Sequence, residues 1–213
     1  MKKIAFSLLI FGATLAYSQS EFQPKNSTIL QSIDGDLDKD GIPEKVVAYN
    51  TNISTDSGFV REIQILKKVN NKWTLWVKSR NALLKSKDGG MMGDPFEMMT
   101  IKNNVLSIVH TGGSSWKWSS TDKYRFQNGE FQLIGATNIS GRPGDYWTDI
   151  DINLSTGKIV YKKEVEGTEN PDNGKSENET AVKKGIKFNL QNRYSKEPTI
   201  IMKLPKTKAE IYL

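Results

Sequence analysis

The sequence contains no cysteine and only one histidine, His110, among its 213 residues. The absence of cysteine excludes disulfides and a lipid-modified cysteine. Without cysteine, and with a single histidine, a zinc site is not expected either. Oxygen ligands from carboxylates therefore remain the main route to a metal site, and they favour a hard cation.

Long apolar runs are also missing after the first residues, so we expect no membrane span in the mature chain. Residues 1–18 have the pattern of a signal peptide, in which two lysines precede a short apolar stretch. Ala16 and Ser18 provide the small residues that suit cleavage before Gln19. We therefore expect an exported protein, either periplasmic or secreted.

No basic stripe or arginine-rich segment occurs, although the formal net charge is +6. The lysines are scattered singly or in pairs such as Lys67-Lys68. Proteins that bind nucleic acid through phosphates gather positive charge on one face. We expect no nucleic-acid partner, and look instead for an extracellular or periplasmic ligand, either a glycan or a protein.

An acidic stretch stands out, with five carboxylates between Asp34 and Glu44, directly before the apolar segment 45–49. Alternate residues of a short loop can turn their oxygens inward, and calcium takes six to eight oxygens at about 2.3–2.6 Å. Glycine at position 41 permits a sharp turn. The expected calcium ligands are the side chains of Asp36, Asp38, Asp40 and Glu44 and the backbone carbonyl of Ile42. The alternatives are a solvated acidic turn or another hard cation, and Asp34 is expected to lie outside the ligand set.

The pattern Asp-x-Asp-x-Asp-Gly-x-x-Glu at residues 36–44 resembles the short calcium loops of FG-GAP/VCBS-type repeats, which lead directly into an apolar strand. More loosely, it resembles loops of dockerins and thrombospondin repeats. It differs from an EF-hand, because position 12 counted from Asp36 is Val47 instead of glutamate. The resemblance covers residues 33–49 and implies calcium binding and propeller-like sheets. The remainder is similar to small secreted bacterial proteins of unassigned function.

From residue 45 onward the sequence has short runs of alternating apolar residues separated by turn signals, and no long segment with helical periodicity. Hairpin turns are predicted at Asn70-Asn71 and Asn103-Asn104, and a type I′ hairpin turn at Asn128-Gly129. We predict one all-β domain over residues 19–213, an antiparallel meander of about nine to eleven strands forming a barrel, sandwich or propeller-like array. The polar segment 166–184 is predicted to be a mobile loop, and the glycine-rich segment 85–95 is a candidate rim of a binding site.

Aromatic and acidic residues offer two alternative functions. Trp116 and Trp118 point to one side of a predicted strand, and Trp147 follows a turn; such residues either form core or stack on sugar rings. A glycosidase needs two carboxylates in one cleft, and the available residues are Asp94, Glu97, Asp145, Asp149 and Asp151. His110 beside Ser114 and Ser115 lacks a recognisable acid partner, which favours a structural histidine. We therefore predict a non-enzymatic, calcium-binding β protein with a binding or structural role. A carbohydrate-binding module is the alternative, and an extracellular polysaccharide hydrolase comes third.

Overall fold

The computed structural model describes residues 21–166 and 174–213, so the expected signal peptide lies outside the described residues. Within these ranges the chain forms thirteen strands and one short 3₁₀ turn, η1 (Gly90–Met92). The strands are β1 (Thr28–Gly35), β2 (Glu44–Thr55), β3 (Gly58–Val69), β4 (Lys72–Ser79), β5 (Phe96–Lys102), β6 (Val105–Gly113), β7 (Lys117–Gln127), β8 (Glu130–Gly141), β9 (Tyr146–Asn153), β10 (Lys158–Val165), β11 (Glu177–Val182), β12 (Ile200–Lys203) and β13 (Glu210–Tyr212). No helix in this part of the chain has the length and apolar character needed to cross a membrane.

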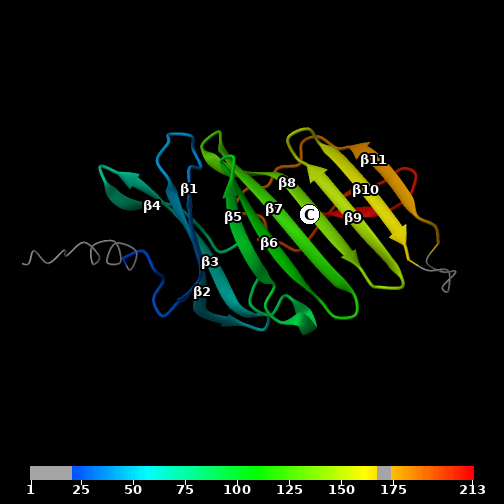
Figure 1. Cartoon of the computed structure of the whole chain (residues 1–213), viewed down its shortest axis with the longest axis horizontal. Helices are drawn as coiled ribbons and strands as arrows, with labels where there is room; N and C mark the ends of the chain where they lie inside the picture. The colour runs from blue at the N-terminus through cyan, green and yellow to red at the C-terminus, as the bar shows by residue number, and fades with distance from the viewer. Residues whose placement is uncertain (1–20, 167–173) are drawn as a thin grey trace, which may run out of the picture.

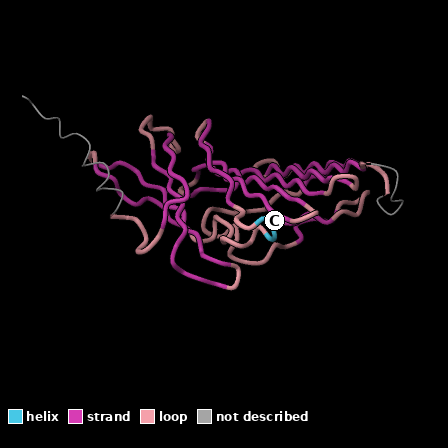
Figure 2. The backbone as a smooth tube through the Cα atoms, turned by 60° about the horizontal axis from the view of Figure 1, so that its bottom comes forward, coloured by secondary structure: helices cyan, strands magenta, loops and turns pink. Residues whose placement is uncertain are grey.

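The strands form three antiparallel sheets. A four-stranded sheet has the order β1-β2-β3-β4, a seven-stranded sheet runs from β11 to β5 in reverse chain order, and β12 pairs with β13. Figure 1 shows the first two sheets beside each other, with the red C-terminal segment behind the seven-stranded sheet. Figure 2 shows that loops cover one face of the seven-stranded sheet, which we call its inner face. The arrangement confirms the predicted all-β antiparallel fold and has the layered form of a sandwich.

Three hairpins follow directly from the sequence. Both central residues have positive φ in the turns Asn70-Asn71 (50° and 60°), Asn103-Asn104 (52° and 60°) and Asn128-Gly129 (53° and 82°). Type I′ turns require this conformation, and asparagine and glycine adopt it most readily. These turns connect β3 to β4, β5 to β6 and β7 to β8, as predicted.

The strand count exceeds the predicted nine to eleven because polar edge strands carry little apolar alternation. The first, β1, pairs with β2 and precedes residue 45, where the predicted strand pattern begins. The second, β11, pairs with β10 inside the segment 166–184, so the prediction of a mobile loop is wrong for residues 177–182. Conversely, residues 186–190 form no strand and make only an isolated bridge, between Gln132 and Asn189.

One continuous core connects the sheets. Buried residues of β2 and β3 join those of β5 to β10, and the C-terminal residues Leu204, Ile211 and Leu213 belong to the same cluster. The two large sheets approach closely at Gly35 of β1, where an added Cβ would lie 2.6 Å from the Cγ2 atom of Ile101 in β5. The absence of a side chain at position 35 therefore lets β1 lie against β5.

Candidate functional site

The acidic segment forms the connection between β1 and β2. The sequence pattern did not predict a strand before this segment. Gly35 pairs with Glu44 as the last pair of the hairpin, and the loop 36–43 lies between them. Leu37 is only 1% exposed and anchors the loop in the core. The side-chain amide of Asn104, in the β5–β6 turn, donates a hydrogen bond to the carbonyl oxygen of Asp36 at 2.8 Å. The loop is therefore fixed at both ends and held against the neighbouring hairpin.

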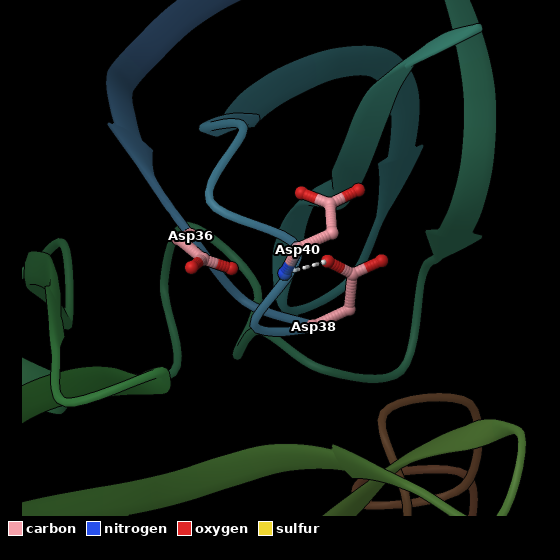
Figure 3. A group of neighbouring side chains, drawn as sticks. All are labelled: Asp36, Asp38 and Asp40. Atoms are coloured by element: carbon pink, nitrogen blue, oxygen red, sulfur yellow. Dashed lines mark hydrogen bonds between the residues drawn. The ribbon is translucent and has the colours of Figure 1, made fainter.

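The three predicted aspartates converge. Carboxylate oxygens of Asp36, Asp38 and Asp40 all lie within 4.8 Å of one another, and Figure 3 shows them on one turn of the loop. Two oxygens on opposite sides of a calcium ion are separated by twice the usual 2.3–2.6 Å bond, so this spacing fits a common ion. Backbone N–H groups of the loop also support the carboxylates, including that of Asp40, which donates to Asp38 Oδ1 at 3.2 Å (Figure 3).

Positive φ values let the chain turn tightly around these carboxylates. Lys39 has a φ of 71° and Gly41 a φ of 81°. The N–H of Lys39 donates to Asp36 Oδ1 at 2.6 Å, and the N–H of Ile42 donates to Asp40 Oδ1 at 2.8 Å. The expected turn role of Gly41 is confirmed, and the predicted ligand Ile42 lies directly after it.

Glu44, the fourth predicted carboxylate, is fully buried. Its Oε2 atom accepts a hydrogen bond from the N–H of Leu37 at 2.7 Å, whereas Oε1 has no hydrogen-bond partner within the described residues. Burial raises the pKa of Glu44, the Leu37 N–H opposes this shift, and the charges of Asp38 and Asp40 raise the pKa further. Glu44 is therefore a buried acid next to a cluster of like charge, with one acceptor unused.

Lys67 of β3 is the protein cation that reaches the acidic loop. Its ammonium group contacts Asp38 and lies 2.9 Å from Asp40 Oδ2. The hydrogen bond from Lys67 lowers the pKa of Asp40, and the two aspartates raise the pKa of Lys67. Asp34 is separate, since it pairs with Lys45 at 2.8 Å. One lysine thus offsets part of the negative charge that three aspartates and Glu44 bring together.

The predicted tryptophans divide between the two faces of the seven-stranded sheet. Trp118 lies over Gly112 of β6 and lines a cavity of about 510 Å³ on the inner face, which we call the tryptophan cavity. Trp116 is 39% exposed and its ring packs on Tyr146 with centroids 5.0 Å apart. Trp147 lies over Gly141 of β8. It follows Tyr146 in β9, and because neighbouring side chains of a strand point to opposite faces, Trp147 points to the outer face. Trp116 and Trp118 therefore share a face, and Trp147 does not.

Two residues of the glycine-rich segment 85–95 also reach this cavity. Lys85 and Asp88 contribute to its lining, together with Asn81 and Leu84 just before them. The segment is positioned by a hydrogen bond from the N–H of Gly113 to the carbonyl of Gly89 at 2.8 Å. The beginning of this segment therefore lines part of a cavity, and its role at the rim of a binding site stays a prediction.

A buried polar cluster on the inner face was not predicted. Asp122 of β7 is 1% exposed, and its Oδ2 atom accepts hydrogen bonds from Arg193 Nε at 2.8 Å and from the Tyr194 hydroxyl at 2.9 Å. His110 packs between the rings of Phe96 and Tyr194. Its Nε2 accepts a hydrogen bond from the N–H of Leu84 at 3.3 Å. This packing indicates a structural role for His110.

The carboxylates considered for hydrolysis are dispersed. Asp94 pairs with the buried Arg61, and the buried Asp145 pairs with Arg142. Asp151 lies exposed on β9, where it accepts a hydrogen bond from Thr137 at 3.1 Å. Asp149 lies two residues before Asp151 on β9 and therefore on the same face of the strand. Glu97 accepts a long hydrogen bond from Thr111 at 3.4 Å. These contacts hold the acids in ion pairs or on the outer face, away from the tryptophan cavity.

Two features therefore remain as candidates, the acidic β1–β2 loop and the cavities of the inner face. The first gathers hard oxygen ligands, and the second combines an aromatic ring with buried charged groups. Comparison with known proteins gives no family, curated relative or solved structure that matches this chain.

Proposed function

We propose that this chain is exported and binds calcium in the loop 36–44, where the ion fixes the β1–β2 hairpin to the rest of the fold. The observation that carries the proposal is Glu44, a fully buried carboxylate whose Oε1 atom has no partner among the described residues. A buried acceptor without a partner costs free energy, and a buried charge costs more unless a cation compensates it. A cation at the aspartate cluster would remove both penalties.

Calcium suits this site better than zinc or copper because every side chain offered is a carboxylate. Hard oxygen ligands favour calcium or magnesium, whereas zinc and copper favour histidine and cysteine. The four acids Asp36, Asp38, Asp40 and Glu44 supply the side-chain oxygens, and the Ile42 carbonyl is the backbone ligand. Because the ion would bind the folded loop, it would stabilise the protein by about 2.7 kcal/mol at a hundredfold excess over Kd.

Thermal unfolding with millimolar calcium and then with chelator tests the proposal. We expect the midpoint temperature to rise by several degrees with calcium, and we expect this rise to disappear in Asp38→Ala/Asp40→Ala. Asp34→Asn is the matched control, because Asp34 is an acid next to the loop that pairs with Lys45 instead. A calcium-dependent rise that persists in the double variant would exclude the aspartates as ligands.

Glu44→Gln provides a second variant that separates charge from fold. Glutamine keeps the size of the side chain and its acceptor for the Leu37 N–H, but removes the buried negative charge. We expect this variant to be at least as stable as the parent in chelator and to respond less to calcium. A full calcium response in Glu44→Gln would show that this carboxylate is not a ligand.

Carbohydrate binding is a second candidate, favoured by one observation, the presence of Trp118 in the tryptophan cavity. An aromatic ring at a cavity wall can stack on a sugar ring. Trp118→Ala should remove binding on a glycan array, whereas Trp147→Ala on the outer face should leave it intact. Circular dichroism of both variants verifies that the fold is retained. Equal binding by both variants would exclude the inner face as the glycan site.

A further inference from the structure

A second cavity adjoins the tryptophan cavity on the inner face. It has a volume of about 350 Å³ and lies between strands β7 to β10 and the C-terminal strand β13; we call it the sheet cavity. This volume is at the small end of the roughly 300–1,000 Å³ range of ligand pockets. The two cavities have five lining residues in common, Ser120, Asn138, Arg193, Tyr212 and Leu213. A ligand that fills one can therefore extend into the other past Arg193.

Arg193 is held rigidly at this junction. Its Nε donates to the buried Asp122, and its guanidinium lies 4.6 Å from the ring centroid of Tyr194 and 5.8 Å from that of Phe188. Burial is the largest single effect and lowers the pKa of Arg193, but the charge and hydrogen bond of Asp122, together with Tyr194 and Tyr124, raise the pKa overall, so the guanidinium stays charged. A side chain that is already fixed loses little entropy when it binds a ligand.

The terminal nitrogens of Arg193 are the part left for a ligand. The side chain is only 10% exposed, yet neither Nη atom is hydrogen-bonded to the described residues and neither is fully sealed from solvent. A guanidinium fork of this kind matches the two oxygens of a carboxylate. The junction therefore presents a preorganised donor pair for an anionic group.

The other charges at the two cavities are of both signs. Arg80, Lys85 and Lys196 line the tryptophan cavity with Arg193, against Asp88 and Glu197. In the sheet cavity, Asp122 is engaged by Arg193 and Tyr194. The remaining acid there, Glu210, accepts a hydrogen bond from Tyr212 and lies 3.5 Å from Lys203. Arg80 is partly offset by Glu62, at 2.8 Å. Among the described residues, Lys85 and Lys196 have no ion-pair partner, and neither do Asp88 and Glu197, so these charges balance and the anion preference rests on Arg193.

Polar uncharged groups line the sheet cavity beside Arg193. They are the hydroxyls of Ser120, Ser140 and Thr148 and the amide of Asn138. The hydroxyls of Ser140 and Thr148 lie 2.8 Å apart in a hydrogen bond, and the Thr148 hydroxyl also donates to the Ser140 carbonyl at 3.1 Å, which leaves each hydroxyl oxygen able to accept a further hydrogen bond. Ile150 and Tyr161 supply apolar surface between them. Such a mixture suits a ring that carries several hydroxyl groups.

We infer that the inner-face cavities bind a sugar that carries a carboxylate, a uronic acid, with the carboxylate on Arg193, the hydroxyls on the serine, threonine and asparagine set, and a ring face on Trp118. The inference rests on the carbohydrate-binding candidate above and names its ligand class. It is independent of the calcium loop, which lies in the other sheet.

Titration calorimetry with D-glucuronate, D-glucose and hexanoate tests the inference. The three probes separate a carboxylated sugar from a neutral sugar and from a simple carboxylate. We expect glucuronate to bind at least tenfold more tightly than either of the others. Arg193→Gln should remove this preference, whereas Arg125→Gln should keep it, because Arg125 faces outward on the same strand as Asp122. Added salt should weaken glucuronate binding more than glucose binding.

Asn138 gives a variant that does not disturb the buried ion pair, because its side chain is exposed at the cavity. Asn138→Asp places a negative charge beside Arg193 and should weaken glucuronate binding at least tenfold more than it weakens glucose binding. Equal binding of glucose and glucuronate, lost in Trp118→Ala, would overturn the carboxylate inference and retain carbohydrate binding. If neither sugar binds, the carboxylate inference and the carbohydrate-binding candidate are both overturned. If hexanoate binds as tightly as glucuronate, the assignment to a sugar is overturned.

Discussion

The ammonium group of Lys67 lies 2.9 Å from Asp40 Oδ2, so a side chain of β3 contributes a positive charge to the loop that connects β1 and β2. The same ammonium contacts Asp38, and it lies 5.3 Å from the ring centroid of Trp76. If calcium binds these two carboxylates, the lysine and the ion are neighbours of like charge that compete for the same oxygens. Lys67 would then stabilise the calcium-free loop and weaken calcium binding.

Lys67→Met should therefore destabilise the calcium-free protein and strengthen calcium binding. In chelator, we expect the variant to unfold at a lower temperature, because the aspartates lose their counter-charge. In calcium, we expect Kd to fall by roughly three- to tenfold, the range expected for the loss of one or two partly exposed ion pairs. Calorimetric titration measures Kd, and thermal unfolding measures both states.

Lys68→Met is the matched control for this prediction. Lys68 is the next residue of β3, and its ammonium lies 5.0 Å from the ring centroid of Trp73, away from the acidic loop. Removal of the same charge there should leave the calcium Kd nearly unchanged. Equal changes in both variants would mean that net charge alone controls binding, with no specific role for Lys67.

The single histidine predicts a loss of stability in mild acid. Burial lowers the pKa of His110 to about 4, from an ordinary value of about 6.5. Because the folded-state pKa is the lower one, the unfolded chain binds the proton first. Stability is therefore complete above pH 6.5 and falls as the pH decreases toward 4. The expected loss between pH 7 and pH 4.5 is about 2–3 kcal/mol.

Urea unfolding across this pH range measures the loss, and proton NMR of an untagged sample reports the titration of its only imidazole directly. Glu44 contributes with the opposite sign, because its raised pKa favours the folded state as the pH falls. Glu44→Gln should therefore show the acid destabilisation more clearly. An imidazole that titrates near 6.5 would contradict the buried position of His110.

The Asp122–Arg193 pair predicts a large effect of removing one partner. Asp122→Asn leaves the largely buried Arg193 without its counter-charge, and such a loss costs about 3–5 kcal/mol. Asp151→Asn on the exposed face of β9 should change stability by less than about 0.5 kcal/mol. Urea unfolding measures both. If the pair is direct, Asp122→Asn combined with Arg193→Met should be less destabilised than the sum of the single variants.

Local chemistry made much of this fold predictable. The Asn-Asn and Asn-Gly turns placed three hairpins correctly, because positive φ is demanded at both positions and few residues accept it. The spacing of Asp36, Asp38 and Asp40 likewise placed three oxygens on one turn, since the loop is short enough for sequence to determine its geometry.

Contacts between distant segments were not predictable in this way. The Arg193–Asp122 hydrogen bond joins residues 71 positions apart, and no periodic pattern surrounds Arg193. The one available signal was Asp122, an acid that lies on the same face of β7 as Ser120 and Tyr124 because these residues are two positions apart. The edge strand β11 was missed because four of its six residues are exposed and its sequence, ENETAV, is mostly polar. Its pairing with β10 supplies the backbone hydrogen bonds that determine its conformation.

The junction between the two large sheets gives a final prediction, which concerns Gly35. An alanine at this position would bring its Cβ to 2.6 Å from Ile101 Cγ2 and 2.9 Å from Ile101 Cβ, distances that require a shift of β1 or β5. Overpacking of this kind costs about 1–3 kcal/mol. Because Gly35 directly precedes the acidic loop, Gly35→Ala should also weaken calcium binding by displacing Asp36 and Leu37 from their present positions.

Gly135→Ala is the control for the change from glycine to alanine. Gly135 lies in β8 with its nearest neighbour atom 3.6 Å from an added Cβ, so alanine fits there without strain. Urea unfolding should show a loss of stability in Gly35→Ala and little change in Gly135→Ala. Ile101→Ala should restore part of the loss when combined with Gly35→Ala, since it removes the Cγ2 and Cδ1 atoms from the contact. If Gly35→Ala is as stable as the parent, β1 and β5 do not approach as described, and the acidic loop is not held against the seven-stranded sheet.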